Sequence, residues 1–449
     1  MNTYVFDSST QKKLFLSFGV GVLLLVLGIL FFGNKSADAG HHATGHEVAA
    51  AQHSPEKPDA HADAAHTEEA GHDAHAVAGH HAPEVTLGKT IMINTYNVFY
   101  FGFYIALAAL FFLAATNLAW GGWHIQIQKI PLAISVTIIL FLALLAGMFV
   151  FFNHDIFEWT HEYLYDPKDP RYDALLASKH DFLNLKTFWI FFVLIAGSAV
   201  ALVAYWWKTL TSLDINPSLK WFSKSRMIAA VTIVIVAFLI NTFATWYWSM
   251  SIQPHWYSTM FTWNTMAGGA VTFLSIMLVL IHYLKGQGYL PRVNDNHLHD
   301  VAKLMFAISV FWTYTWFAQY MLIWYANIPE ETEYFRLRRS ADNYGFLFHF
   351  SFVLNFILPF FILMTRNSKR SKNTTIVAAV IIIFGQFAAF FLMNCPPILP
   401  KGGFGLISIG LLLMIGSVFI YLTLFILSKV KDLASTTHPY VNESYHHHI

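Results

Sequence analysis

Ten long apolar stretches alternate with polar segments along the chain. Each holds about 20 predominantly apolar residues, the length that a helix needs to cross the hydrocarbon core of a membrane. They predict spanning helices over residues 13–32, 95–119, 130–152, 187–207, 227–250, 259–284, 304–326, 344–365, 374–395 and 404–428. The pattern therefore predicts an all-α integral membrane protein with both ends of the chain on one side.

The composition agrees with this class and narrows the chemistry. Hydrophobic residues make up 56% of the 449 residues and charged residues 12%, whereas a soluble domain is about 25% charged. The single cysteine, Cys395, excludes an internal disulfide, a cysteine-ligated iron–sulfur cluster and a CxxCH haem attachment. A net charge of +1 gives no reason to expect a nucleic-acid partner. We expect no cofactor in this chain and only bound lipids.

The positions of lysine and arginine predict the orientation. The side of the membrane that holds the N-terminus carries 16 of the 27 Lys and Arg residues, and these lie in shorter segments than the other 11. Basic residues concentrate on the cytoplasmic side of membrane proteins. The pattern places both ends in the cytoplasm and the segment after the first span outside.

That outer segment is rich in histidine. Ten of the 23 histidines lie between His41 and His81. Their spacing is irregular, and almost no large apolar residue lies between Asn34 and Pro83. Structural metal sites need regularly placed ligands in a segment that can fold around them. We interpret residues 34–89 as an outer-side linker rather than as a metal site.

An internal similarity suggests two related units. Residues 151–164, after the third span, and 324–335, after the seventh, both place an Asn at the membrane edge, followed by acids and a Glu-Tyr pair. Four spans separate them, which predicts two four-helix units, spans 2–5 and 6–9, with spans 1 and 10 peripheral. The segments expected are 1–33 (N-terminus and first helix), 34–89 (linker), 90–258 (first unit), 259–403 (second unit) and 404–449 (last helix and cytoplasmic tail).

Polar residues inside the spans are few and uncharged. The predicted spans contain no Asp, Glu or Arg, and intramembrane polar groups are costly enough to be functional candidates. Asn241, Gln319, His349 and Asn355 form a candidate proton path, with His349 as the titratable group. The alternative is that these side chains only bond neighbouring helices, and the lack of an intramembrane carboxylate favours it. A haem would need a second histidine facing His349, and only His154 or His255 could approach, from the outer rim.

Two outer loops carry a concentrated polar and aromatic surface. The loop after the third span contains His154, Asp155 and Glu158. His154, Glu158 and His161 could hold a metal if the segment is helical, because i, i+4 and i+7 share a face. We favour an interfacial segment that docks a soluble partner. The tight turn between the fifth and sixth spans adds Pro254, His255, Trp256 and Tyr257.

Residues 249–264 (SMSIQPHWYSTMFTWN), 293–331 and the FFNH motif ending at His154 resemble the ActF membrane subunits of bacterial alternative complex III, a quinol:cytochrome c oxidoreductase. The resemblance extends over most of the chain. It implies NrfD-like architecture with two four-helix units. It implies as partners a paralogous membrane subunit that oxidises quinol, such as menaquinol, outer-side subunits with iron–sulfur clusters and multiple c-type haems, and a terminal oxidase. A contribution to proton translocation is also implied.

Residue by residue, Pro254, His255, Trp256 and Tyr257 match the family's turn, and His154 matches its FNH motif. Two positions depart from the family, which commonly has Asp-Trp before the turn and an acid before the proline. Here these positions are Tyr247 and Gln253, which weakens a proton route through the chain. The function expected is a non-catalytic membrane subunit that scaffolds the redox subunits. A quinol-binding redox subunit and a secondary transporter stay open as alternatives.

Overall fold

The computed structural model describes residues 3–43, 85–340, 344–400 and 402–447. It is 80% helical, and the described residues form no strand. The α-helices are α1 (Ser8–Ala43), α2 (Leu87–Leu118), α3 (Lys129–Val136), α4 (Ile138–Ile156), α5 (Ala174–Ala177), α6 (Leu185–Ile215), α7 (Leu219–Val234), α8 (Asn241–Trp248), α9 (Thr259–Gly286), α10 (Asp295–Ala326), α11 (Pro329–Arg339), α12 (Gly345–Phe352), α13 (Leu358–Leu363), α14 (Arg366–Arg370), α15 (Lys372–Asn394), α16 (Leu406–Ser428) and α17 (Val441–Tyr445). Short 3₁₀ turns are η1 (Gly122–Gln126), η2 (Glu158–Thr160), η3 (Glu162–Tyr165) and η5 (Met250–Ile252), and η4 (Ile235–Ile240) and η6 (Val353–Ile357) are π-helical.

All ten predicted spans are confirmed. Within the described residues, ten helical segments are long and apolar enough to cross a membrane. Three of them are built from shorter pieces: α3 and α4 form the third span, α7, η4 and α8 the fifth, and α12, η6 and α13 the eighth. The protein is therefore an all-α integral membrane protein.

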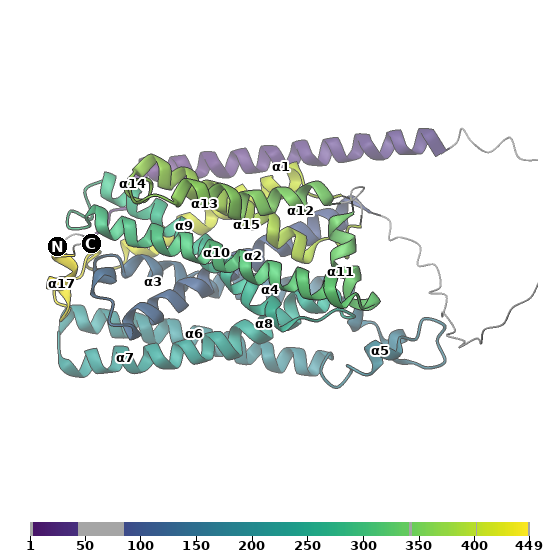
Figure 1. The fold of residues 1–449 in the computed structure, drawn as a ribbon, viewed down its shortest axis with the longest axis horizontal. Helices are drawn as coiled ribbons and strands as arrows, with labels where there is room; N and C mark the ends of the chain where they lie inside the picture. Colours follow the sequence, from purple (N-terminus) through teal and green to yellow (C-terminus); the bar gives the residue numbers. More distant parts are fainter. Residues whose placement is uncertain (1–2, 44–84, 341–343, 401, 448–449) are drawn as a thin grey trace, which may run out of the picture.

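The spans run side by side along the long axis of the molecule (Figure 1). Both ends of the described chain lie at the same end of the bundle, as an even number of spans requires. We call this the near end and the opposite one, which carries α5 and α11, the far end. The near end corresponds to the side predicted to face the cytoplasm.

Helices α2 and α9 form the centre of the bundle. The most apolar stretches of α2 and α9 are 78% and 83% buried, against 11% for α1. The two central helices approach each other closely at Gly269, because this residue has no side chain. A Cβ there would lie 2.8 Å from the Tyr104 carbonyl oxygen. Such small residues let helices pack in lipid.

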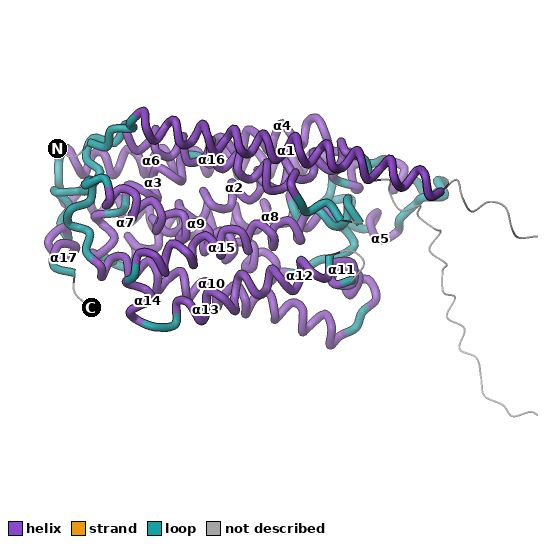
Figure 2. The backbone as a smooth tube through the Cα atoms, turned by 90° about the horizontal axis from the view of Figure 1, so that it is seen from above, coloured by secondary structure: helices purple, strands orange, loops and turns teal. Residues whose placement is uncertain are grey.

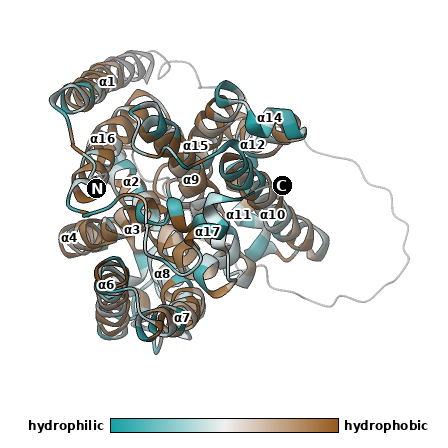
Figure 3. Ribbon diagram, turned by 90° about the vertical axis from the view of Figure 1, so that its left-hand side faces the viewer, coloured by the Kyte–Doolittle hydropathy of each residue, from teal (hydrophilic) through white to brown (hydrophobic). Residues whose placement is uncertain are grey.

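The other helices surround this centre. Helices α3, α4 and α7 pack with α2, and α6 packs with α7, α4 and α3. Helices α10, α12, α13 and α15 pack with one another or with α9. Helix α1 packs chiefly against α16, and this pair lies at the edge of the bundle (Figure 3). These contacts follow the grouping of spans 2–5 and 6–9, although the proposed relationship between the units and their exact boundaries stay predictions.

Helix α1 extends farther than expected. It continues to Ala43, ten residues past the predicted end of the first segment, as a long projecting helix (Figure 2). The sequence has no proline before Pro55 to stop it. Residues 44–84, with most of the histidine-rich linker, lie outside the described residues.

The C-terminal segment, residues 429–447, closes the near end. The Gln126 side chain donates to the Ser435 carbonyl (2.9 Å) and Thr437 donates to the Leu213 carbonyl (3.1 Å), which fixes the segment on the first unit. His447 reaches the second unit, where its Nε2 lies 2.7 Å from Asp300 Oδ2. The segment therefore joins loops from both halves of the bundle.

Two histidines are buried here, His438 of this segment and His124 of the loop that it covers. Burial lowers the pKa of His124 and of His438 to about 4. The Lys129 ammonium, which is paired with the Asp214 carboxylate, contributes to the lowered pKa of His438. Both imidazoles are therefore neutral at pH 7 and fit a closed near end.

We expect the protein to lose stability on mild acidification. A histidine whose pKa is lowered by folding binds fewer protons folded than unfolded, so its contribution is complete above about pH 6.5 and falls as the pH drops towards 4. At pH 5 each histidine lowers the free energy of unfolding by about 2 kcal/mol relative to neutral pH. The melting temperature of the purified protein, measured from pH 8 to pH 5, should fall, and H124Q with H438Q should flatten the profile. An unchanged slope in the double variant would contradict this assignment.

Candidate functional site

Buried polar side chains gather on the two sides of α9 in the far half of the bundle. One group, which we call the tyrosine cluster, lies between α2 and α8 and consists of Tyr96, Tyr100, Tyr104, Asn241 and Thr245. The other, which we call the α10 cluster, lies among α9, α10, the eighth span and α15 and consists of Asn264, Ser309, Trp312, Thr315, Gln319, Ser351, Asn355 and Gln386.

The tyrosine cluster is built on a regular spacing. Tyr96, Tyr100 and Tyr104 are four residues apart on α2 and therefore share one face. Tyr104 is hydrogen-bonded to the Thr245 hydroxyl (2.5 Å) and donates to the Asn241 carbonyl (3.2 Å). The Tyr100 hydroxyl has no partner among the described residues. The sequence analysis did not select these tyrosines, although their spacing is visible in it.

Asn241 follows the π-helical segment η4 directly. A π-helical turn displaces the usual backbone bonding, and such turns are frequent at functional sites. The Thr242 hydroxyl bonds the Ala237 carbonyl within this segment (3.4 Å). The Asn241 amide donates to the Thr262 carbonyl of α9 (3.4 Å), while its Oδ1 lacks a partner among the described residues. Asn241 therefore belongs to the tyrosine cluster. On α9 it contacts only the side that faces this cluster.

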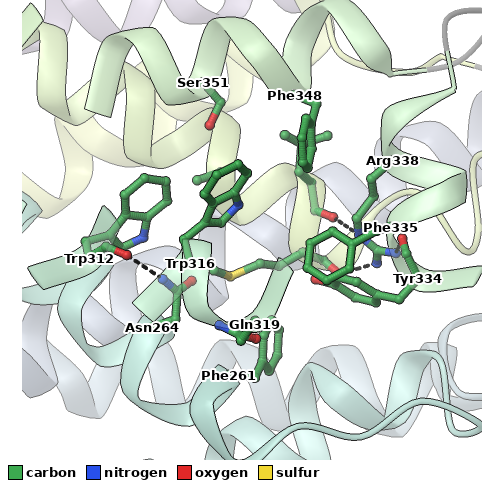
Figure 4. A pocket seen from close by; sticks show the side chains of 13 residues that line it. Phe261, Asn264, Trp312, Trp316, Gln319, Tyr334, Phe335, Arg338, Phe348 and Ser351 are labelled. Atoms are coloured by element: carbon green, nitrogen blue, oxygen red, sulfur yellow. Dashed lines mark hydrogen bonds between the residues drawn. The ribbon is translucent and has the colours of Figure 1, made fainter. Parts of the chain in front are cut away.

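The α10 cluster contains Gln319 and a chain of contacts to α9 (Figure 4). The Asn264 amide donates to the Trp312 carbonyl and to the Thr315 hydroxyl, each at 3.0 Å. Gln319 Nε2 donates to the Thr315 carbonyl (3.1 Å), and its Oε1 accepts from Ser258 (3.4 Å). These bonds place Gln319 at the far-end opening of the cluster.

Asn355 owes its place to a proline. Pro359 lacks the N–H that would bond the carbonyl four residues earlier, so the Asn355 carbonyl loses its helical donor. The segment becomes π-helical, and the Ser309 hydroxyl of α10 donates to this carbonyl instead. The membrane interior offers no water for this role, so a neighbouring helix must supply it.

Several buried atoms of the α10 cluster make no hydrogen bond within the described protein. They are Trp312 Nε1, Asn355 Oδ1 and both terminal atoms of Gln386. Buried polar atoms are nearly always hydrogen-bonded, to protein or to ordered water. A cavity of about 30 Å³ lies between Asn264, Gln319 and Ser351, beneath α11, with room for about two water molecules. Of the residues with unpartnered atoms, Trp312 lines this cavity, which is therefore suited to holding water.

Arg338 closes this cavity at the far end (Figure 4). It is 2% exposed, and the described residues place no carboxylate within ion-pair distance of it. Its guanidinium donates to the carbonyls of Leu392 (2.6 Å), Met393 (3.1 Å) and Tyr334 (2.7 Å), and it lies 3.4 Å from the centre of the Tyr334 ring. Burial lowers its pKa, but arginine stays charged. The C-terminal carbonyls of α15, the negative end of the helix dipole, thus hold a buried cation.

Gln253 supplies the fourth acceptor. Arg338 donates to Gln253 Oε1 at 3.1 Å. This is the position at which the resembling family commonly has an acid. An acid here would neutralise the arginine, whereas glutamine leaves its positive charge facing the cavity.

The turn at residues 254–257 is held in place by contacts with Tyr334 of α11 and with Asp173 and Lys179. Trp256 is 1% exposed and stacks on Tyr334 with ring centres 3.8 Å apart. His255 Nε2 lies 2.5 Å from Asp173 Oδ2, and Lys179 donates to the Pro254 carbonyl (2.7 Å). Burial tends to raise the pKa of Asp173, but the Leu176 N–H and His255 outweigh it and lower that pKa. Pro254 and Trp256 therefore support the surface, and only Tyr257 is fully exposed on it.

His154, Asp155 and Glu158 are all exposed at the far end. Helix α4 ends at Ile156 and η2 follows, so the helical spacing assumed for a metal site with His161 does not occur. His154 instead contacts the Thr160 hydroxyl (3.1 Å), and its carbonyl contacts His161 Nε2 (3.0 Å). In the described part of the chain, no group of three His, Cys, Asp or Glu side chains is arranged to hold a metal.

His349 corrects the expected proton path. Its side chain is exposed on the outside of the bundle, in the first turns of α12, and its Nδ1 bonds the Gly345 carbonyl (2.7 Å). The buried face of α12 carries Leu347, Phe348 and Ser351, and His349 points away from it. Asn241 lies in the tyrosine cluster, while Gln319 and Asn355 lie in the α10 cluster. The four predicted residues therefore do not form one path.

Fold and site together define an integral membrane protein with two buried polar clusters, a small interior cavity and a structured far-end surface. No protein-family model matches the chain, and a comparison with curated proteins finds no similar one. The similarity to ActF subunits therefore stays a prediction from the sequence.

We expect Arg338 to be essential for stability. Replacing it with glutamine leaves up to four acceptors without their charged donor, at a cost of about 3 kcal/mol or more. R336Q, at an exposed arginine of the same helix, is the matched control and should change stability by less than about 0.5 kcal/mol. Melting temperatures in one detergent would compare the two variants. Equal values would show that the buried arginine is not a structural anchor.

Proposed function

We propose that the chain is an integral membrane subunit of a quinol:cytochrome c (or oxidase) electron-transfer complex in the bacterial cytoplasmic membrane, with both ends cytoplasmic. The far end would dock the iron–sulfur and c-type haem subunits, and a paralogous subunit beside it would oxidise quinol. The observation that carries the proposal is the far-end surface, on which Tyr257 of the turn is exposed, as are His154, Asp155 and Glu158.

The construction of this surface supports docking. His255, Asp173 and Lys179 fix the turn by two polar contacts, and Trp256 anchors it to α11. A surface held rigid before contact loses less entropy on binding. The exposed groups above this support are an aromatic ring, histidine and acids, a polar set suited to a soluble partner.

The docking proposal predicts co-isolation. Purification from native membranes in mild detergent should recover the chain with subunits that carry c-type haem and iron–sulfur clusters, detected by absorbance spectra. The double variant D155K/E158K should lower the haem recovered per chain, because it reverses two exposed charges at the far end. K220E, an exposed reversal at the near end, should leave recovery unchanged. Isolation of the wild-type chain without redox subunits would refute the proposal and favour a transporter.

We further propose that the α10 cluster carries protons through water. Its side chains are amides, hydroxyls and an indole, and none of these changes charge near neutral pH. Transfer would therefore follow hydrogen-bonded water between them. The Arg338 cation at the far end of the cavity would oppose the passage of cations through that opening.

The proton proposal has a matched control in His349. In the complex reconstituted into vesicles, Q319L and N355L should lower the number of protons released per quinol oxidised, while electron transfer continues. H349L should leave this ratio unchanged, since His349 lies outside the bundle. Unchanged ratios in Q319L and N355L would refute proton transfer through the cluster without touching the docking proposal.

A further inference from the structure

A large apolar groove lies between α1, α16 and the body of the bundle. Its volume is about 460 Å³, and residues of α1, α2, α4, α9, α15 and α16 line it. The walls are almost wholly apolar and include Phe101, Ile276, Ile383, Leu412 and Ile420. Protein interiors are close-packed and keep few voids larger than a water molecule, so this groove calls for an apolar occupant.

The pairing of α1 with α16 leaves this space open. The two helices touch closely at Gly21 and Gly410, which have no side chains. A Cβ on Gly21 would lie 2.7 Å from the Met414 backbone nitrogen, and a Cβ on Gly410 would lie 2.7 Å from the Leu25 backbone nitrogen. Ser417 also donates to Ser17 (2.9 Å). These contacts hold α1 to α16, while few contacts hold α1 to α2.

The length of the groove matches one leaflet of a bilayer. Along α16 it runs from Leu412 to Leu424, which is about 18 Å at the helical rise of about 1.5 Å per residue. Half of the hydrocarbon core of a bilayer is about 15 Å thick. A single acyl chain from the near-end leaflet would therefore extend along it.

One end of the groove is polar. Thr10, Lys13 and Tyr283 lie there, and the hydroxyls of Thr10 and Tyr283 are 2.7 Å apart. The Tyr4 hydroxyl lies 3.3 Å from that of Tyr283. Lys13 is exposed and has no carboxylate within ion-pair distance among the described residues. An ammonium beside hydroxyl donors at the membrane surface is complementary to a lipid phosphate.

We propose that this groove binds one phospholipid of the near-end leaflet, with an acyl chain between α1 and the bundle and the phosphate at Lys13. The lipid supplies the packing that α1 lacks on this side. The site stands independently of the proposed function, since it uses none of the far-end residues.

The acyl-chain site is tested by filling it. Gly416 lines the groove, and a Cβ there meets nothing within 4 Å, so G416L should fold and occupy the space. Gly19 is an exposed glycine of α1 with equal room and does not line the groove, so G19L is the matched control. After size-exclusion chromatography, phospholipid per chain is counted by mass spectrometry. G416L should retain one phospholipid fewer than the wild type and G19L.

The phosphate site is tested with lysine variants. Wild-type protein equilibrated with equal phosphatidylglycerol and phosphatidylcholine should retain the anionic lipid about fivefold more. K13Q should lose this preference, whereas K12Q, at the exposed neighbour outside the groove, should keep it. Equal phospholipid counts in G416L and G19L, an unaltered preference in K13Q, or a retained isoprenoid quinone in place of phospholipid would each overturn the proposal.

Discussion

Every polar group inside a membrane-spanning bundle needs a partner from the protein or from trapped water, because the surrounding lipid offers none. This requirement explains the interior of the protein. Pro359 removes one helical donor, and Ser309 on a neighbouring helix replaces it. Buried Arg338 has no carboxylate beside it in the described structure, and the last carbonyls of α15 with Gln253 and Tyr334 surround it. The α10 cluster arises because groups on neighbouring helices supply the hydrogen-bond partners that these residues lack.

The same requirement links the interior to the far-end surface. Arg338 belongs to α11, and Tyr334 of that helix stacks both on Arg338 and on Trp256 of the surface turn. The cavity, the buried cation and the exposed turn are therefore mechanically connected through one short amphipathic helix. A partner that moves the turn would also move the cation that closes the cavity.

The near end is organised differently. Several of its ionisable groups are paired or neutral: Lys129 with Asp214, His447 with Asp300, and His124 and His438 with lowered pKa values. The C-terminal segment covers these groups and ties the two halves together. At the edge of the bundle, the pair α1 and α16 leaves a leaflet-deep groove, which shows how little of α1 is held by protein contacts.

The sequence by itself determined the class of protein and the ten spans, because the length of an apolar stretch is a local property of the sequence. It also pointed to the turn at 254–257 and to Asn241, Gln319 and Asn355 as buried polar residues. Only the tertiary structure decided which polar residues meet. It moved His349 to the outside, separated Asn241 from Gln319 by α9, and showed that Arg338 of α11 is buried. The rotation of each helix about its axis fixes these neighbours, and that rotation depends on packing between helices distant in the sequence, such as the contact of Gly269 with Tyr104.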